Sequence, residues 1–282
     1  MLNQNQNQNT NNPLAVVTGA SSGIGYELAV QFAQAGYDLL VIAEDAAITQ
    51  AAEELKALGT QVRSFQCDLA RADGVDACYR EIQDMHRPVS ALALNAGVGV
   101  NGKFFETSLD EEINVINLNV ISTVHLAKHI VRDMVERGQG GKILITSSVA
   151  ATTPGPYMAI YNASKAFVQS FSEALHYELK EKGITVTALM PDATDTEFFN
   201  RAGMNDTKVG VQEKDDPAMV AKQGFEALMA GKDHVLAGSF KHRMKNAMND
   251  LLPEQSKAKM YAGAAKPGSA AGAKETKDKQ SA

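Results

Sequence analysis

Cysteine is scarce in this sequence. The 282 residues include only Cys67 and Cys78, too few for a disulfide framework. Neither lies in a Cys-x-x-Cys pair or a Cys/His cluster of the kind that holds a metal. We therefore expect two unreactive thiols.

Excess basic charge and long apolar runs are also absent. The 27 Lys and Arg residues against 33 Asp and Glu give a formal net charge of -6, which argues against a nucleic-acid partner. No run approaches the roughly 18 apolar residues needed to span a bilayer. The N-terminal residues lack the basic-then-apolar pattern of a secretory signal. These absences predict a cytoplasmic protein with no membrane partner.

The two ends of the chain differ in composition from its middle. Residues 1–12 contain almost nothing that could be buried, so we expect a disordered polar tail. Residues 262–282 consist largely of Ala, Gly, Lys and Ser, and we expect a second disordered, low-complexity tail. Residues 13–261 show no internal repeat and no linker, which predicts one domain.

Within that domain, short apolar runs alternate with longer segments of helical period, as in βαβ units. The predicted strands are Leu14–Thr18, Asp38–Ala43, Gln61–Gln66, Ala91–Leu94, Lys142–Thr146, Thr185–Met190 and His234–Ala237. The predicted helices are Tyr26–Gln34, Ile48–Leu58, Val75–Met85, Asp110–Arg137, Tyr161–Lys182 and Pro217–Met229. Near-continuous apolar strands suit a parallel sheet covered on both faces. The fold class predicted is α/β, a Rossmann-type doubly wound sheet of about seven strands.

A glycine-rich turn joins the first strand to its helix, in the run Thr18-Gly19-Ala20-Ser21-Ser22-Gly23-Ile24-Gly25. Glycines here let backbone N–H groups approach a pyrophosphate, and a helix N-terminus favours negative charge. The alternative is an ordinary glycine-rich turn with no ligand.

A second motif, Tyr161-Asn162-Ala163-Ser164-Lys165, opens a predicted helix and follows Ser147-Ser148 at the end of the fifth strand. Residues four apart share a helix face, so Tyr161 and Lys165 can point into one site. A nearby ammonium would stabilise phenolate, as would a bound ligand that carries positive charge, and we expect the pKa of Tyr161 to fall from about 10 towards working pH. Tyr161 is thus a candidate acid or base. In isolation, the same spacing would suit two surface residues.

Taken together, these motifs resemble the short-chain dehydrogenases/reductases over nearly all of residues 13–238. The spacing Gly-x-x-x-Gly-x-Gly matches, and so does the order of Asp68, Asn95-Ala96-Gly97, Ser148 and Tyr161. The resemblance implies an NAD(P)-dependent oxidoreductase for an alcohol or carbonyl substrate. It also implies a homodimer or homotetramer packed through the long helices that begin near Asp110 and Tyr161.

The resemblance assigns roles to single residues. It implies Ser148, rather than Ser147, as the donor to the substrate oxygen, and Asn119, rather than Asn117, as the support of a water-linked proton relay to Lys165. The implied catalytic residues are Asn119, Ser148, Tyr161 and Lys165. The implied cofactor-binding residues are Gly19, Ser21, Ser22, Gly23, Ile24, Gly25, Glu44, Asp68, Leu69, Asn95, Ala96, Gly97, Tyr161, Lys165, Pro191, Thr194 and Thr196.

The chain departs from the family pattern after the sixth strand. The family has Pro-Gly-x-x-x-Thr there, whereas this chain has Pro191-Asp192-Ala193-Thr194-Asp195-Thr196. We expect Asp192 to take the left-handed conformation that a glycine would adopt. Thr196 still fits the family threonine that holds the nicotinamide carboxamide.

Acidic residues end the second strand, at Glu44-Asp45. A carboxylate accepts bonds from ribose hydroxyls but repels a 2′-phosphate, so NAD is favoured over NADP. The alternative is that both acids cap the next helix.

Two further regions leave alternatives open. Phe198, Phe199 and Met204, in the segment 197–216, fit either an apolar substrate pocket under a lid or core packing. The loops 98–105 and 150–160 should border the same cleft. The stretch Lys241–Met248 fits a partner-binding amphipathic helix or a solvated helix face. His125 and His129 have the spacing of a metal-binding pair, but no third ligand is evident, and we predict no metal.

The predicted reaction moves a hydride between nicotinamide and the substrate carbon while Tyr161 moves the proton. One rival is an idle nucleotide-binding regulator, which loss of Tyr161, Lys165 or Ser148 would have indicated. Another is an epimerase or dehydratase of sugar nucleotides, for whose larger C-terminal domain this chain has little room.

Overall fold

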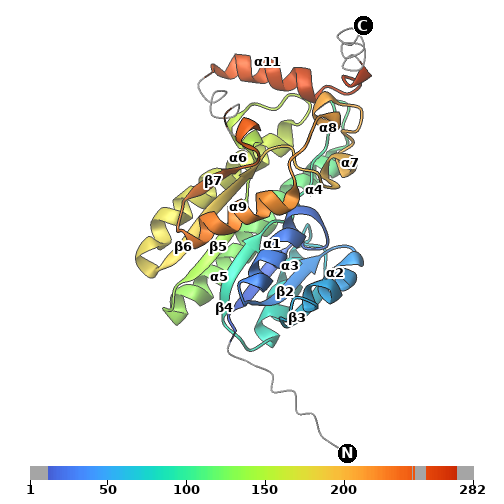
Figure 1. The fold of residues 1–282 in the computed structure, drawn as a ribbon. Helices are drawn as coiled ribbons and strands as arrows, with labels where there is room; N and C mark the ends of the chain where they lie inside the picture. Colours follow the sequence, from blue (N-terminus) through green and yellow to red (C-terminus); the bar gives the residue numbers. More distant parts are fainter. Residues whose placement is uncertain (1–11, 243, 245–251, 272–282) are drawn as a thin grey trace, which may run out of the picture.

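Seven parallel strands form one sheet through the middle of the molecule (Figure 1). The computed structural model describes residues 12–242, 244 and 252–271. The strands are β1 (Leu14–Thr18), β2 (Asp38–Ala43), β3 (Val62–Gln66), β4 (Val89–Leu94), β5 (Gly141–Thr146), β6 (Ile184–Pro191) and β7 (His234–Ala237). Their order is β3-β2-β1-β4-β5-β6-β7, which confirms the predicted doubly wound fold.

Helices connect these strands across both faces. They are α1 (Gly23–Gln34), α2 (Ala47–Lys56), α3 (Ala72–Asp84), α4 (Leu109–Ile116), α5 (Ser122–Arg137), α6 (Ala159–Leu179), α7 (Phe198–Arg201), α8 (Lys208–Val211), α9 (Pro217–Met229) and α11 (Glu254–Ala265). The helix predicted over 110–137 is interrupted by a π-helical turn, η1 (Asn117–Ile121), which separates α4 from α5.

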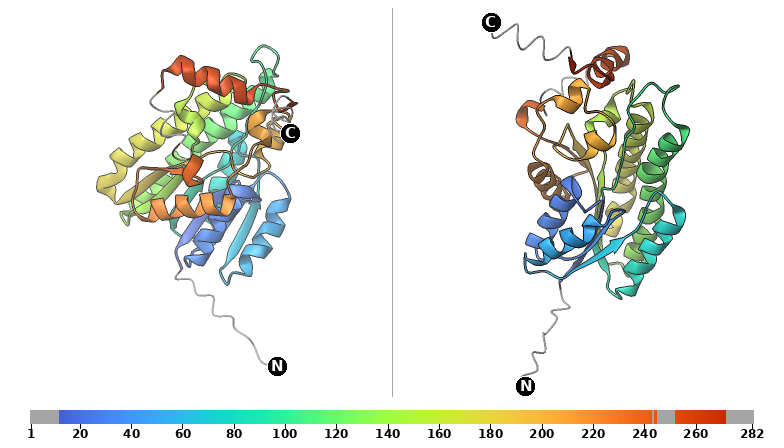
Figure 2. Two further views of the ribbon diagram at one scale, coloured as in Figure 1. Left: turned by 45° about the horizontal axis from the view of Figure 1, so that its top comes forward. Right: turned by 90° about the vertical axis from the view of Figure 1, so that its right-hand side faces the viewer.

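Each face of the sheet has its own apolar core. Side chains alternate along a strand, so Val16 of β1 packs with α3, α5 and α6, while Val17 packs with α1, α2 and α9. The right-hand view of Figure 2 shows α1 and α2 on one side of the sheet and α3 and α5 on the other. Burial on both faces explains why the central strands are almost wholly apolar.

The strand order reverses between β1 and β4. Chain connections leave these neighbouring strands in opposite directions, so their carboxyl ends border a crevice. Because every strand is parallel, the turns after β2, β3, β5 and β6 open at the same edge of the sheet. That edge carries the motifs identified in the sequence.

The C-terminal part of the folded unit extends beyond the predicted boundary at Tyr261. Helix α11 continues to Ala265, and Ser269 Oγ accepts a hydrogen bond from Lys208 N at 2.9 Å. The second tail was therefore predicted to begin too early, because an Ala- and Gly-rich composition conceals a helix that tertiary contacts stabilise. Residues 272–282 lie outside the described residues.

Two other segments for which the sequence made predictions lie mostly outside the described residues. The N-terminal tail lies outside it apart from Asn12, whose side-chain amide donates to Asp38 at 3.2 Å. The amphipathic helix considered over 241–248 lies outside it except for residues 241, 242 and 244. Among the helices that are described, none is long and apolar enough to cross a membrane.

Asp38, at the start of β2, is a buried carboxylate held by an ion pair with Arg87 at 2.8 Å. Burial alone would raise its pKa, but hydrogen bonds from Arg87, Asn12, Gln61 and Thr60 outweigh burial and lower the pKa below its ordinary value. The interaction joins β2 to the segment just before β4, at the sheet edge opposite the crevice.

We predict that Arg87→Met destabilises the protein by roughly 3–5 kcal/mol at pH 7, because it leaves a buried carboxylate unpaired. A depressed folded-state pKa gives stability that is present above the unfolded pKa and lost as pH falls. The deficit should therefore shrink below about pH 4, where Asp38 takes up a proton. Urea unfolding across this pH range measures both effects. The control is Arg71→Met, which removes a solvent-exposed pair with Asp73 and should leave the urea midpoint almost unchanged.

Candidate active site

A cavity of about 370 Å³ opens at the carboxyl ends of the central strands. Its volume lies in the range of small-molecule sites. The structure brings to it nearly all residues that the motifs singled out: Gly19, Ser21, Ser22, Gly23, Ile24, Glu44, Asp68, Leu69, Asn95, Ala96, Gly97, Ser148, Tyr161, Lys165, Pro191, Thr194 and Thr196. Gly25 and Asn119 do not line the cavity and lie directly behind its wall.

The glycine-rich turn forms one wall. Gly19 has φ +66°, and a Cβ there would lie 2.9 Å from Ala96 Cα, so only glycine lets the backbones of the turns after β1 and β4 approach this closely. A Cβ on Gly25 would collide with the carbonyl oxygen of Gly19. Ser22 precedes α1 without a side-chain cap, which leaves the first N–H groups of that helix directed at the cavity edge. These features suit close approach of a phosphate.

Asn95 links three of the strands around the crevice. Its side-chain amide donates to Gly19 O at 3.4 Å, and its carbonyl accepts from Thr146 Oγ1 at 3.0 Å. Thr18 Oγ1 accepts the backbone N–H groups of Asn95 and Ala96, at 3.0 and 3.2 Å. The run Asn95-Ala96-Gly97 thus fixes how β1, β4 and β5 sit relative to one another.

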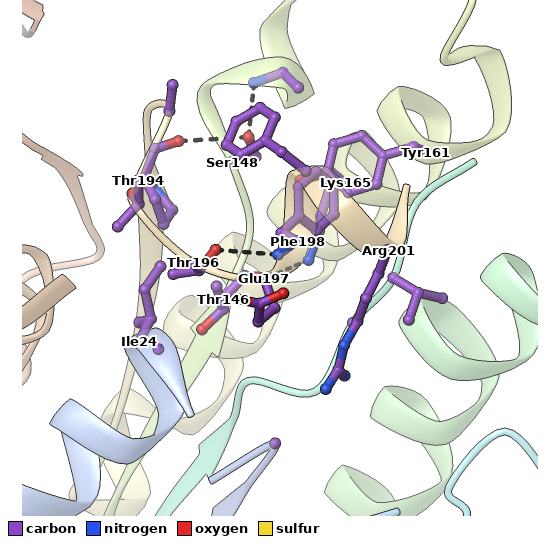
Figure 3. A pocket seen from close by; sticks show the side chains of 18 of the residues that line it. Ile24, Thr146, Ser148, Tyr161, Lys165, Thr194, Thr196, Glu197, Phe198 and Arg201 are labelled. Atoms are coloured by element: carbon purple, nitrogen blue, oxygen red, sulfur yellow. Dashed lines mark hydrogen bonds between the residues drawn. The ribbon is translucent and has the colours of Figure 1, made fainter. Parts of the chain in front are cut away.

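Tyr161 lies at the opposite end of the cavity, in the first turn of α6, with Ser148 and Lys165 (Figure 3). Burial raises the pKa of Tyr161 to about 12, and the hydrogen bond with Ser148 acts in the opposite direction. Burial therefore opposes the fall in the pKa that the sequence predicts from the ammonium of Lys165 together with an oxidised nicotinamide. Lys165 Nζ lies 5.8 Å from the centre of the Tyr161 ring.

Lys165 is a buried cation on the same helix face as Tyr161. Burial lowers its pKa to about 8, and Nζ donates to Thr146 O at 2.9 Å. Its ammonium is therefore bound to the end of β5, one turn of helix away from the phenol. Because desolvation penalises charge on both groups, an anion near Lys165 or a cation near Tyr161 would shift the pair strongly.

Asn119 supports the cavity wall from the π-helical turn. Its amide donates to Val98 O and to Ser164 Oγ, both at 2.9 Å, while its carbonyl accepts from Val98 N at 3.0 Å. The extra residue of a π turn redirects such a side chain, and π turns recur at functional sites. Asn119 thereby holds the loop after β4 against α6.

The turn after β6 differs from its prediction. The positive φ angles of non-glycine residues in the described chain belong to His86 and Tyr157, so Asp192 is not left-handed. Its carboxylate instead accepts from Ala193 N at 2.7 Å, and Thr194 Oγ1 donates to Asp192 O at 2.8 Å. A local side-chain bond shapes the turn without glycine's freedom.

Acidic groups gather at the end of β2. Asp45 accepts from Ser21 Oγ at 3.0 Å and from Ala47 N at 3.1 Å, so it both caps α2 and contacts the glycine-rich turn. Glu44 is exposed and lines the cavity. Asp68, after β3, accepts from Ala70 N at 2.8 Å, as a turn-forming Asp does.

Arg201 reaches the same acidic corner from α7. Its guanidinium lies 3.4 Å from Asp45 Oδ2 and 3.9 Å from Glu44 Oε1. Arg201 was not predicted as a site residue. It lies 156 positions after Asp45 in the chain, and only the packing of α7 at the cavity brings the two side chains together. Figure 3 shows it on the same short helix as Phe198.

Comparison with known proteins agrees with these features. The family described as short chain dehydrogenase matches residues 13–206. The chain belongs to this family. The resemblance drawn from the motifs is thereby confirmed.

Among curated short-chain dehydrogenase relatives, "Probable oxidoreductase EphD" of Mycobacterium tuberculosis (strain ATCC 25618 / H37Rv) is 32% identical over 193 residues. The match covers 68% of this chain and 33% of the relative, so the chain spans about a third of that relative's length.

Two solved structures are similar to this chain. A short-chain dehydrogenase from Sphingobium yanoikuyae in complex with NADPH has TM-score 0.74 and 31% identity, covering 79% of this chain and 87% of its own. A short chain dehydrogenase/reductase from Burkholderia phymatum in complex with NAD has TM-score 0.72 and 26% identity, covering 80% and 88%.

In this short-chain dehydrogenase, helix α11 roofs the cavity above the tyrosine. Lys257, Met260 and Tyr261 line it, and Tyr261 Oη donates to Asn162 Oδ1 at 3.0 Å. No residue of α11 was predicted from the sequence as a site residue. The spacing of Lys257, Met260 and Tyr261 along one helix face was the available signal.

The segment after β6 combines both roles considered for it. Phe199 and Met204 are buried in a small core with Ala265, yet both also line the cavity. Phe198 packs on Tyr161, with ring centroids 5.0 Å apart. The same residues form the small core and line the cavity, because Phe199, Met204 and Ala265 of this segment and α11 pack together beside the site.

Cys67 also differs from expectation. It is half-buried and lines the cavity, and a hydrogen bond with Cys78 lowers the pKa of its thiol. The same bond, together with burial, raises the pKa of Cys78. Only the packing of α3 against β3 brings these thiols together, so the sequence could not distinguish them.

Proposed function

We propose that this short-chain dehydrogenase is an NAD(P)-dependent oxidoreductase that interconverts a secondary alcohol and a ketone. The observation that carries the proposal is the convergence of Ser148, Tyr161 and Lys165 at one end of the cavity whose other end is the glycine-rich turn. A proton-transfer group and a phosphate cradle thus share one enclosed space.

The residues present fit a dinucleotide. The side chain missing at Gly19, and the uncapped N–H groups of α1, leave room and donors for a pyrophosphate. Glu44 and Asp68 would contact the adenosine, and Lys165, Thr194 and Thr196 would hold the nicotinamide half. When bound, the nicotinamide would supply or accept the hydride.

Proton transfer then belongs to Tyr161. In reduction, its phenol donates a proton to the substrate oxygen as the carbonyl carbon gains a hydride, and Ser148 donates a hydrogen bond to the same oxygen. A phenol whose pKa is near 12 is protonated at neutral pH, which is the form that reduction needs. Oxidation requires the phenolate, and the ammonium of Lys165 would then favour it.

The lining beside Tyr161 favours an apolar substrate. Met158, Phe198, Met204, Val209 and Met260 surround this end of the cavity. These five side chains carry no charge. Lys257 lines the cavity beside Met260, but its ammonium is already paired with Glu254 at 2.9 Å and donates to Thr152 O at 3.3 Å. We propose a ketone or alcohol with hydrocarbon substituents on both sides of the reacting carbon.

Tyr161→Phe should reduce kcat by roughly 10²–10⁴-fold, because it removes the proton donor while keeping the ring. Affinity for the reduced cofactor, measured by nicotinamide fluorescence, should change less than about twofold. Tyr177→Phe is the matched control, since Tyr177 lies on the same helix with its side chain in solvent. A Tyr161→Phe enzyme as active as the control would refute the mechanism.

We propose NAD as the preferred cofactor. Glu44 and Asp45 place two carboxylates at the end of β2, against the single guanidinium of Arg201. A 2′-phosphate would meet a net negative corner, whereas ribose hydroxyls would find acceptors. Arg201 is the group through which binding of NADP would be tolerated.

Titration with NADH and NADPH should therefore show NADH binding at least tenfold more tightly. Glu44→Gln should narrow this ratio by removing a repulsive charge, and Arg201→Ala should widen it by removing the cation. Glu53→Gln, an exposed change on α2, serves as the control. Tighter binding of NADPH by the unaltered protein would overturn the assignment of Glu44.

We also propose a homodimer built on α4, α5 and α6. Large apolar side chains are exposed on these elements, among them Leu109, Ile113, Ile121 and Phe167. Such a patch on a folded protein commonly marks an interface.

Light scattering should give a mass at least twice the 30.2 kDa of the chain. Phe167→Glu should shift the population towards monomer, since it buries a charge in the contact, while Leu58→Glu, an equally exposed apolar site after α2, should not. A monomeric unaltered protein at micromolar concentration would exclude this interface.

A further inference from the structure

Two histidines and an aspartate meet where α3 packs against α5, away from the cavity. Asp76 of α3 and His125 and His129 of α5 each offer a ligand atom, and these atoms all lie within 4.8 Å of one another. His125 Nε2 is 3.2 Å from Asp76 Oδ1. The third ligand that the sequence could not show thus comes from a neighbouring helix, across the packed α3–α5 contact.

The imidazole of His129 is held in place without use of its nitrogens. Its ring stacks on Tyr79, with centroids 4.3 Å apart and an interplanar angle of 18°. Tyr79 is itself fixed, because its hydroxyl donates to the Asp133 carboxylate at 3.0 Å. Within the described residues, no protein atom forms a hydrogen bond or ion pair with the imidazole of His129. Its nitrogens are therefore available to an external ligand.

The carboxylates near these two histidines favour a cation. Across the part of the chain that the structure describes, neither Asp76 nor Asp133 forms an ion pair with a Lys or Arg. Asp76 has only His125, and Asp133 has the neutral hydroxyl of Tyr79. The exposed position of Asp76 gives an ion a path from solvent.

We propose that Asp76, His125 and His129 bind one zinc ion. Two imidazole nitrogens and one carboxylate oxygen are a donor set that zinc accepts with water as the fourth ligand, whereas magnesium and calcium prefer oxygen alone. Zinc–ligand distances of about 2.0–2.2 Å can be reached from atoms within 4.8 Å by side-chain shifts of under about 1 Å.

The site would act on the fold rather than on the reaction. None of the three ligands lines the cavity. An ion bound there would join α3 to α5, and both helices cover the same sheet face. Binding to the folded state alone should therefore raise the melting temperature.

Calorimetric titration of the chelator-treated full chain with zinc chloride tests the proposal. One equivalent should bind to the unaltered protein, and His129→Ala and Asp76→Ala should each weaken binding at least about tenfold. His234→Ala is the matched control: it removes another His–Asp pair at 3.2 Å, between His234 and Asp233, which belongs to no three-ligand group among the described residues. It should leave binding unchanged.

Two further measurements keep the result interpretable. Thermal melts without metal establish that each variant folds, and zinc should raise the melting temperature of the unaltered protein but not of His129→Ala. Cobalt(II) bound in place of zinc should show the visible bands of a four-coordinate site without thiolate charge-transfer absorption. No zinc binding, equal binding by the three variants, or loss of binding in Cys67→Ser would each overturn the proposal.

Discussion

The side chain of Asn95 and its partners form the hydrogen-bond path on which the site depends. It runs from Gly19 O through the Asn95 amide to Thr146, whose carbonyl oxygen accepts from Lys165 Nζ. The glycine-rich turn and the lysine come from opposite halves of the sheet, and this path sets their separation. Parallel strands alone would align the turns at one edge, but they would not fix the distance between them.

Desolvation dominates the electrostatics at the tyrosine end. The same burial raises the pKa of Tyr161 and lowers that of Lys165, because it disfavours the charged form of each group. Neither shift comes from the partner, since the ammonium is bound to Thr146 O instead. A charged ligand in the cavity would therefore change the protonation of Tyr161 and Lys165. Water does little to screen its charge in a buried site.

Segments with little sequence signal complete the site. Helix α7 brings Arg201 to Asp45 and Phe198 to Tyr161. Helix α11 brings Tyr261 to Asn162, the residue that follows Tyr161. These helices are short or rich in small residues, so they depend on each other and on the cavity wall for their packing.

Local sequence was enough to predict in what order the strands and the main helices follow one another along the chain. It also predicted the strand-turn-helix setting of Gly19 and the position of Tyr161 and Lys165 on one helix face. These follow from local periodicity, from the backbone geometry open to glycine, and from fixed helical spacing. Tertiary structure alone decided the direction of the pKa of Tyr161, the conformation of Asp192, the arrival of Arg201, the helix beyond Tyr261 and the meeting of Asp76 with two histidines. Each of these depends on burial or on contacts between residues far apart in the chain, and local sequence encodes neither.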